Sequence, residues 1–144
     1  RDSRDFSIEG VKIKAKESSG YVKKLVQELP SVEVVDVKGK LKACPANINL
    51  LSSLQILRLS ENKLSALPSE IGQCKALEEL DLSTNSFQKI PFELAKIKQI
   101  RCVNFANNQL SAFPKIFLEE LETVILTKNE FTDFPLNICV LRKI

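Results

Sequence analysis

Three neighbouring carboxylates are the residues in this sequence best suited to chemistry by type and spacing. Glu78, Glu79 and Asp81 lie close enough along the chain to share a cation. Their spacing lacks the glycine turn and the alternating oxygen ligands of a calcium loop, so we interpret them as a solvated acidic surface. The chain contains no histidine, which removes the commonest general base and the commonest metal ligand. We therefore expect no catalytic residues, no metal and no cofactor.

The size and composition of the chain are those of one globular domain. It has 144 residues, of which 44% are apolar and 27% are charged. The net charge of +3 is unevenly placed, because residues 1–44 hold 10 basic and 7 acidic side chains whereas residues 45–144 hold 11 of each. No apolar run approaches the length of a membrane span, and no signal-peptide pattern opens the chain.

The spacing of the prolines reveals an internal repeat. Five of the six prolines are separated by 23, 23, 23 and 21 residues, at Pro45, Pro68, Pro91, Pro114 and Pro135. Periods of this length are typical of solenoid proteins. Rows laid out on this period share the pattern LxxLxLxxNxLxxLPxxIxxLxx and begin at Leu54, Leu77, Ile100 and Leu121.

Each row predicts a short strand followed by a turn. Alternating residues such as Leu57 and Leu59 give the strand one apolar face, and successive rows should pair as a parallel sheet. One asparagine recurs at a fixed position in the turn, as Asn62, Asn85, Asn108 and Asn129. An amide both donates and accepts, so we expect this structural asparagine ladder to bond the backbone of adjacent rows. No row can cover its own apolar face, and stability must come from stacking.

These rows resemble the leucine-rich repeat family, and the match covers residues 32–144. The 23-residue length and the Leu-Pro pair are similar to the plant-intracellular-Ras-group type of repeat. The resemblance implies an α/β leucine-rich repeat solenoid, with a curved parallel sheet on its concave face and short helical or extended convex segments. It also implies a non-catalytic, cytoplasmic module or scaffold that binds a protein partner, whose identity it does not give.

We predict a single domain over residues 1–144, with five repeats in residues 32–144 and a degenerate N-terminal capping repeat in residues 6–31. The row from Val32 has a turn one residue short and lacks the asparagine. Upstream, the strand spacing recurs 24 residues earlier, at Ile8, Val11 and Ile13. A helix should follow, with the apolar face Tyr21, Val22, Leu25, Val26 and Leu29. The alternative is a basic arm without fixed structure.

Side chains between the framework residues of each strand should point out of the concave face and decide what is bound. The first outward column consists of Val34, Ile56, Glu79, Cys102 and Thr123. The second consists of Asp36, Arg58, Asp81, Asn104 and Ile125. The exposed apolar residues of these columns predict a contact site. The acidic residues between Arg58 and Arg101 suit a protein partner that presents a basic segment. The alternative is that scattered exposed apolar residues are normal on any surface.

The four cysteines stand at four different positions of the repeat. Cys44 and Cys74 occupy framework positions, so we expect both in the core. Cys102 should point outward next to Arg101, and Cys139 stands at another position. Their spacings match neither a metal site nor a capping disulfide pattern, which favours a reducing compartment.

Two other functions remain open. Ile144 would begin a sixth row with no polar cover, so the chain could be the recognition arm of a larger signalling enzyme or ubiquitin ligase. Alternatively, it could be the assembly subunit of a ribonucleoprotein that contacts RNA through the N-terminal lysines. Only Tyr21 lies among these lysines, and RNA readout usually needs more stacking side chains. We therefore do not expect nucleic acid as the partner.

Overall fold

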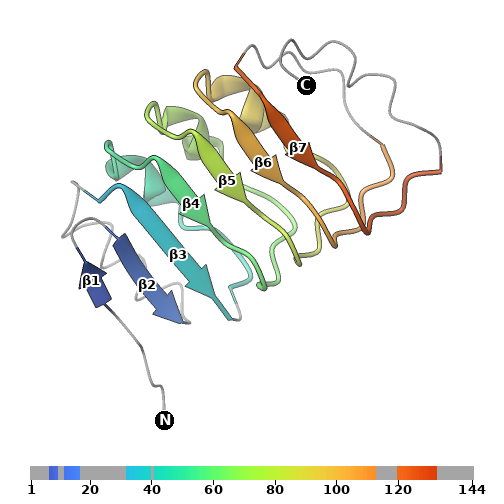
Figure 1. The fold of residues 1–144 in the computed structure, drawn as a ribbon, viewed down its shortest axis with the longest axis horizontal. Coiled ribbons are helices and arrows are strands. Elements are labelled where there is room, and N and C mark those ends of the chain that lie inside the picture. Colours follow the sequence, from blue (N-terminus) through green and yellow to red (C-terminus); the bar gives the residue numbers. More distant parts are fainter. Residues whose placement is uncertain (1–6, 10–11, 17–31, 40, 113–119, 133–144) are drawn as a thin grey trace.

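The sheet dominates the fold. The computed structural model describes residues 7–9, 12–16, 32–39, 41–112 and 120–132, and their strands lie side by side in chain order (Figure 1). The strands are β1 (Ser7–Glu9), β2 (Lys12–Lys16), β3 (Val34–Lys38), β4 (Ile56–Arg58), β5 (Glu79–Asp81), β6 (Cys102–Asn104) and β7 (Thr123–Ile125). β1 pairs with β2 antiparallel, whereas each later pair from β2–β3 to β6–β7 is parallel.

The row length predicts the register between the repeats correctly. Leu57 on β4 pairs with Leu80 on β5, which pairs with Val103 on β6, and this in turn pairs with Val124 on β7. The first three of these side chains are buried, and Val124 is half-buried. Neighbouring positions on either side point away from the core, so one face of the sheet is apolar and the other is open.

Short 3-10 turns form the side of the fold behind the sheet. They are η1 (Ala46–Leu50), η2 (Ser69–Gln73) and η3 (Phe92–Lys96), and each follows a proline with extended backbone. Proline fixes its own φ and has no N–H to leave unpaired, so it suits the position immediately before such a turn. The expected short convex segments are present in these three rows.

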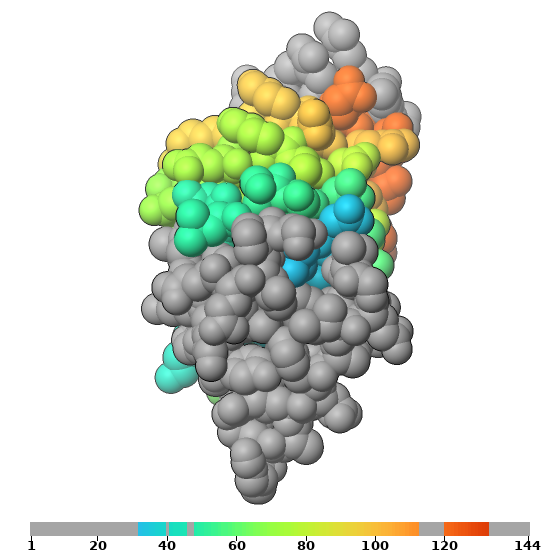
Figure 2. Space-filling model, turned by 90° about the vertical axis from the view of Figure 1, so that its left-hand side faces the viewer, coloured from blue at the N-terminus to red at the C-terminus, as the bar shows by residue number. Residues whose placement is uncertain are grey.

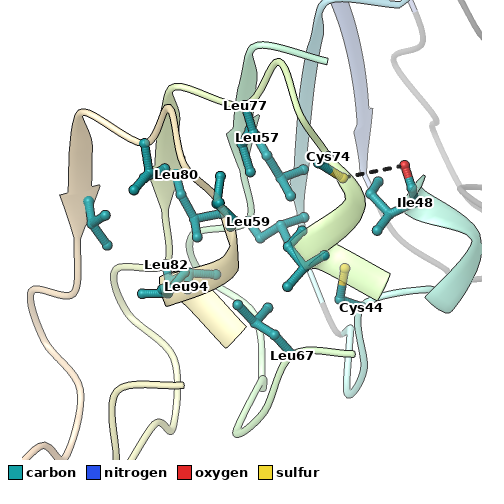
Figure 3. Close-up of a cluster of buried hydrophobic side chains, with 14 of the residues drawn as sticks. Cys44, Ile48, Leu57, Leu59, Leu67, Cys74, Leu77, Leu80, Leu82 and Leu94 are labelled. Atoms are coloured by element: carbon teal, nitrogen blue, oxygen red, sulfur yellow. Dashed lines mark hydrogen bonds between the residues drawn. The ribbon is translucent and has the colours of Figure 1, made fainter. Parts of the chain in front are cut away.

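The core is one continuous cluster that runs through the stacked rows. Figure 3 shows side chains from successive rows, including Leu57, Leu80 and Leu94, meeting between the sheet and the 3-10 turns. Phe87 and Phe105 add an edge-to-face ring contact with centroids 5.6 Å apart. Each fully buried leucine stabilises the fold by roughly 1.5–3 kcal/mol, and it does so against its neighbouring rows. The rows follow one another as bands of colour in Figure 2.

The recurring asparagines join adjacent rows. The Asn85 Nδ2 donates to the carbonyl oxygen of Leu59 in the preceding row at 2.9 Å and to that of Leu82 in its own row at 3.1 Å. Its Oδ1 accepts the backbone N–H of Leu64 at 2.9 Å. The same three kinds of bond recur at Asn62, Asn108 and Asn129. The amide thus satisfies backbone groups where the chain leaves the sheet.

The residue before each of these asparagines has a left-handed backbone. Glu61, Thr84, Asn107 and Lys128 have φ between 53 and 58°. In the shortened row from Val32, Gly39 takes the corresponding place with φ 143°, and its N–H donates to the Glu61 carbonyl at 3.1 Å. Glycine adopts this conformation without the Cβ clash that other residues meet, which explains why the incomplete turn contains one.

The register predicted for the N-terminal segment is wrong by two residues. The sequence spacing aligned Val11 with Val35, but Ile13 is the residue that pairs with Val35. The reason is that Ile8 lies on β1, which turns back and pairs with β2, so that Ile8 lies opposite Ile13. These two residues therefore cannot lie along one strand, as the repeat spacing requires. The helix expected between residues 21 and 29 lies outside the described residues.

Candidate functional site

The outward columns of the sheet form one surface across β3 to β7. Strand pairing places Ile56, Glu79, Cys102 and Thr123 in a line, and Arg58, Asp81, Asn104 and Ile125 in a second line. Val34 and Asp36 extend the two lines onto β3. Thr123 is exposed and the other members of both columns are half-buried, so their side chains are accessible but held by their neighbours.

Arg101 is held between two carboxylates at the edge of the first column. Its Nη2 donates to both oxygens of Glu122, at 3.1 and 3.0 Å, and its Nη1 lies 3.5 Å from Oε1 of Glu78. Hydrogen bonding to Glu122 is the main cause that raises the pKa of Arg101. One nitrogen thus contacts both oxygens of Glu122, and charge-assisted hydrogen bonds of this kind are stronger than neutral ones.

A second ion pair crosses between the two columns. The Arg58 Nη2 lies 3.5 Å from Oε1 of Glu79 in the next row. Asp81 is held differently, because its Oδ1 accepts the Ser83 backbone N–H at 3.0 Å and the Ser83 hydroxyl at 2.7 Å. The acidic surface expected from the sequence is therefore built from carboxylates with fixed partners, and is less freely solvated than we expected.

A shallow hollow of about 350 Å³ opens over the middle rows of this face. Ile56, Glu79, Cys102 and Thr123 of the first column line it, together with Gln55, Glu78, Arg101 and Glu122. Its charged lining residues are three carboxylates and one guanidinium, so the hollow favours cationic ligands. Arg58, Asp81, Asn104 and Ile125 lie beside the hollow in the second column, and Val34 and Asp36 lie one row away.

The sequence columns missed one line of residues in this hollow. Gln55 and Glu122 precede the first outward position of their rows, in line with Glu78 and Arg101. Backbone bonds tie this line together: the Arg101 N–H donates to the Glu78 carbonyl, and the Glu122 N–H donates to that of Arg101, both at 2.7 Å. Alignment of the rows could have revealed this line, because it places side chains of alternating charge at the position before each outward column.

The cysteines of the described region are free thiols with raised pKa values. Desolvation, followed by the charges of Glu79 and Asp81, raises the pKa of Cys102. Burial, with a smaller contribution from Cys74, raises the pKa of Cys44 to about 12, and burial raises the pKa of Cys74 to about 11. A thiol attacks as its thiolate, so these environments disfavour reactivity.

In the described part of the chain, no group of three or more histidine, cysteine, aspartate or glutamate side chains is arranged to hold a metal ion. None of the helices described has the length and hydrophobicity that a bilayer crossing requires.

Comparisons with known proteins agree with the stacked rows. The family model described as Leucine Rich repeats (2 copies) matches residues 52–96. A leucine-rich repeat protein from Leptospira interrogans has a TM-score of 0.72 at 31% identity, over 83% of this chain and 30% of that one. The fold is a leucine-rich repeat solenoid. The expected fold class is thereby confirmed.

Other solved leucine-rich repeat structures are similar to this solenoid. An internalin from Listeria monocytogenes has a TM-score of 0.69 at 18% identity, over 83% of this chain and 34% of that one. The ectodomain of the Arabidopsis thaliana receptor kinase GASSHO1/SCHENGEN3, solved with CASPARIAN STRIP INTEGRITY FACTOR 2, has a TM-score of 0.63 at 26% identity, over 78% and 15%. The chain thus spans about a third or less of each of these proteins. No curated protein sequence matches it.

The leucine-rich repeat architecture has a general functional meaning. Proteins built on it typically mediate protein–protein interaction and are typically not enzymes.

Proposed function

We propose that this leucine-rich repeat solenoid is a non-catalytic binding module whose concave face takes a protein segment with basic and apolar side chains. The observation that carries the proposal is the hollow over β4 to β6, where the carboxylates of Glu78, Glu79 and Glu122 outnumber the guanidinium of Arg101. Ile56 and Thr123 provide less polar contact area at two sides of the same hollow.

The arrangement suits binding because it is already ordered before a partner arrives. Parallel pairing fixes the spacing of the columns, and Arg58 and Arg101 hold the carboxylates in place. Ordering side chains on binding costs about 0.5–1.5 kcal/mol for each long side chain, and a preformed surface avoids part of that cost. Fixed carboxylates also favour the correct partner over an acidic one.

One relative adds support. The GASSHO1/SCHENGEN3 ectodomain, 26% identical to this chain over the matched region, was solved in complex with CASPARIAN STRIP INTEGRITY FACTOR 2. A leucine-rich repeat ectodomain that is similar to this chain over part of its length therefore forms a complex with another molecule. From that protein we carry over to the present chain only the use of a leucine-rich repeat domain for non-catalytic recognition.

We further propose that the module acts in the cytoplasm and that its repeats are of the plant-intracellular-Ras-group type. The free thiols of Cys44, Cys74 and Cys102 are compatible with a reducing compartment. The 23-residue row and the Leu-Pro pair support the repeat type. Fusing the chain to a redox-sensitive reporter in its native cells and locating it by fractionation tests the compartment.

The concave site is tested with a variant that changes its shape and charge together. Ile56→Arg, Glu79→Gln and Glu122→Gln make the lining of the hollow more positive by three charges, and Glu70→Gln with Glu130→Lys is the charge-matched control outside the hollow. Partners captured by the wild type should be lost with the triple variant and kept with the control. Repeating the comparison with a purified partner measures the affinity directly. If every partner stays bound to a folded triple variant, the concave site is wrong.

A further inference from the structure

A second hollow lies on the opposite side of the solenoid from the concave face. It has a volume of about 620 Å³ and lies along the seam between η2 and η3, which pack against each other. Phe92, Gly72 and Ala95 supply apolar lining, and Lys75, Lys96 and Lys98 supply its charge. Among the described residues, no acidic side chain lines this hollow.

Phe92 is an exposed aromatic residue that the repeat does not need. Its side chain is 66% exposed, although it is the first residue of η3. The corresponding residues of the two preceding turns are Ser69 and Ala46, so this position has no framework role. A single exposed apolar residue is common on protein surfaces, so Phe92 becomes a candidate contact residue only together with the cationic side chains around it.

The three lysines surround this apolar surface. The Lys96 Nζ lies 5.8 Å from the centre of the Phe92 ring, within range of a cation–π contact. The Lys75 Nζ donates to the Gly72 carbonyl at 3.2 Å, which holds it at the other side of the seam. Lys98 completes the cationic lining. The charge of this hollow is therefore opposite in sign to that of the concave hollow.

Gly72 brings the two turns into close contact at this seam. A Cβ placed on Gly72 would lie 2.7 Å from the Cβ of Lys96 and 2.9 Å from its Cδ. The hydrocarbon stem of Lys96 therefore packs directly on the backbone of η2 at Gly72, while its Nζ lies near the ring of Phe92. The stem adds apolar surface while its ammonium group stays at the rim.

We propose that this hollow, lined by Phe92, Lys75, Lys96 and Lys98, binds an acidic peptide segment of a partner protein. An aromatic or aliphatic side chain of that segment packs on Phe92, and its flanking carboxylates pair with the lysines. Charge complementarity selects the acidic partner, and the apolar lining selects a segment that carries a hydrophobic anchor. The hollow presents one exposed aromatic ring among cations, whereas a membrane-binding amphipathic helix presents a continuous apolar face. Single-stranded nucleic acid usually stacks on several aromatic rings along a groove.

The test uses three synthetic peptides and the whole chain. The first peptide has a tryptophan flanked by aspartates and glutamates, the second replaces the tryptophan with serine, and the third replaces the acids with lysines. Fluorescence anisotropy should show that the first binds at least on the order of tenfold more tightly than the other two, with affinity that falls as salt increases. Equal binding of the first two peptides would show that Phe92 anchors nothing and would overturn the proposal.

Variants locate the binding on the chain. Phe92→Ser introduces the residue of the preceding turn, so folding should be kept, and affinity for the first peptide should fall roughly tenfold. Leu50→Ser removes the other exposed large apolar side chain of the described region and should leave the affinity unchanged. Lys75→Gln, Lys96→Gln and Lys98→Gln together should remove most of the salt dependence, with Lys63→Gln as the single-charge control.

Two further measurements keep this inference separate from the proposed concave site. The concave variant with Ile56→Arg, Glu79→Gln and Glu122→Gln should bind the first peptide as the wild type does. A change in that binding would place the peptide on the concave face and contradict the proposal. RNA and vesicles with anionic lipid are offered as competitors. If either binds more tightly than the peptide and depends on Phe92, the acidic-peptide occupant is wrong.

Discussion

Arg101 holds the carboxylate of Glu122 from the neighbouring row with both Nη2 bonds near 3 Å, at 3.1 and 3.0 Å. The guanidinium also lies 3.5 Å from Glu78 on the other side. Arg101 is thus the cation that partly neutralises the acidic hollow on the concave face. Exposed ion pairs of this kind are screened by water and contribute little to stability.

We predict that Arg101→Gln separates binding from stability. The change leaves Glu78 and Glu122 without their guanidinium partner and makes the hollow more acidic, so an arginine-rich peptide should bind more tightly at low salt. Urea unfolding should change little, because the pair is exposed. Titration calorimetry at low and high salt checks the binding. Weaker binding at low salt would mean that Arg101 itself contacts the partner.

Asn85→Ala should destabilise the solenoid strongly. The substitution removes the acceptor of the buried Leu64 N–H, and a buried group left unsatisfied costs about 1–3 kcal/mol. It also removes one of the two amide donors to each of the carbonyl oxygens of Leu59 and Leu82. Urea unfolding followed by circular dichroism measures the loss. Asn49→Ala is the control, since its amide bonds only an exposed side chain, that of Gln73, and should cost less than about 1 kcal/mol. Equal losses would contradict a special role for the ladder.

Thr84→Asn should stabilise the protein. Thr84 is a β-branched residue with φ 53°, and asparagine tolerates this left-handed conformation better, as Asn107 does at the same place in the next row. We expect a gain of about 0.5–1 kcal/mol in the free energy of unfolding. Thr132→Asn, outside the positions with positive φ, should give no gain. A loss of stability in Thr84→Asn would mean that the hydrogen bond from the Asn107 Nδ2 to the Thr84 hydroxyl contributes more than the relief of backbone strain.

The buried thiols should make the fold less stable at alkaline pH. Burial raises the pKa values of Cys44 and Cys74 to about 12 and about 11, from an ordinary value of 9.0 that the unfolded chain retains. Above pH 9 the unfolded state releases these protons while the folded state keeps them. Stability is therefore fully present below pH 9 and falls as the pH rises toward the folded pKa values.

The double variant with Cys44→Val and Cys74→Val tests this effect. Each buried thiol should cost about 1.4 kcal/mol per pH unit over the window in which only the unfolded state ionises. Unfolding by urea with a reducing agent, at about pH 8 and about pH 10, should show a flatter pH dependence in the variant than in the wild type. Identical slopes would mean that other groups dominate the alkaline loss.

The repeated part of the fold could be predicted because each row has the same pattern of buried and exposed residues as its neighbours. The pairing of Leu57 with Leu80 follows directly from the row length, since a slip of one residue would turn every framework side chain into water. The two outward columns follow from the same alternation. Gln55 and Glu122, which lie in line with Glu78 and Arg101, were missed because they precede the strand, where apolar alternation no longer indicates which side chains face the hollow.

Features without a repeat were harder to predict. The spacing of Ile8 and Ile13 resembles one strand, but only the backbone pairing shows that β1 turns back on β2. Phe92 stands at a variable position of the pattern, so the sequence alignment gives it no weight. Its exposure and its lysine neighbours emerge only when η2 and η3 are placed side by side.

Parallel pairing in constant register fixes the spacing between outward side chains of the concave face, and this spacing differs between the two directions of the sheet. Members of one column, such as Ile56 and Glu79, are about 4.8 Å apart across the strands, whereas Ile56 and Arg58 are about 6.6 Å apart along one strand. An extended partner presents same-side residues at the longer interval, so it matches the face only when it runs along the strands. A partner that crosses the strands must space its contacts at the shorter interval. The two spacings of the face therefore determine the direction in which an extended partner can bind.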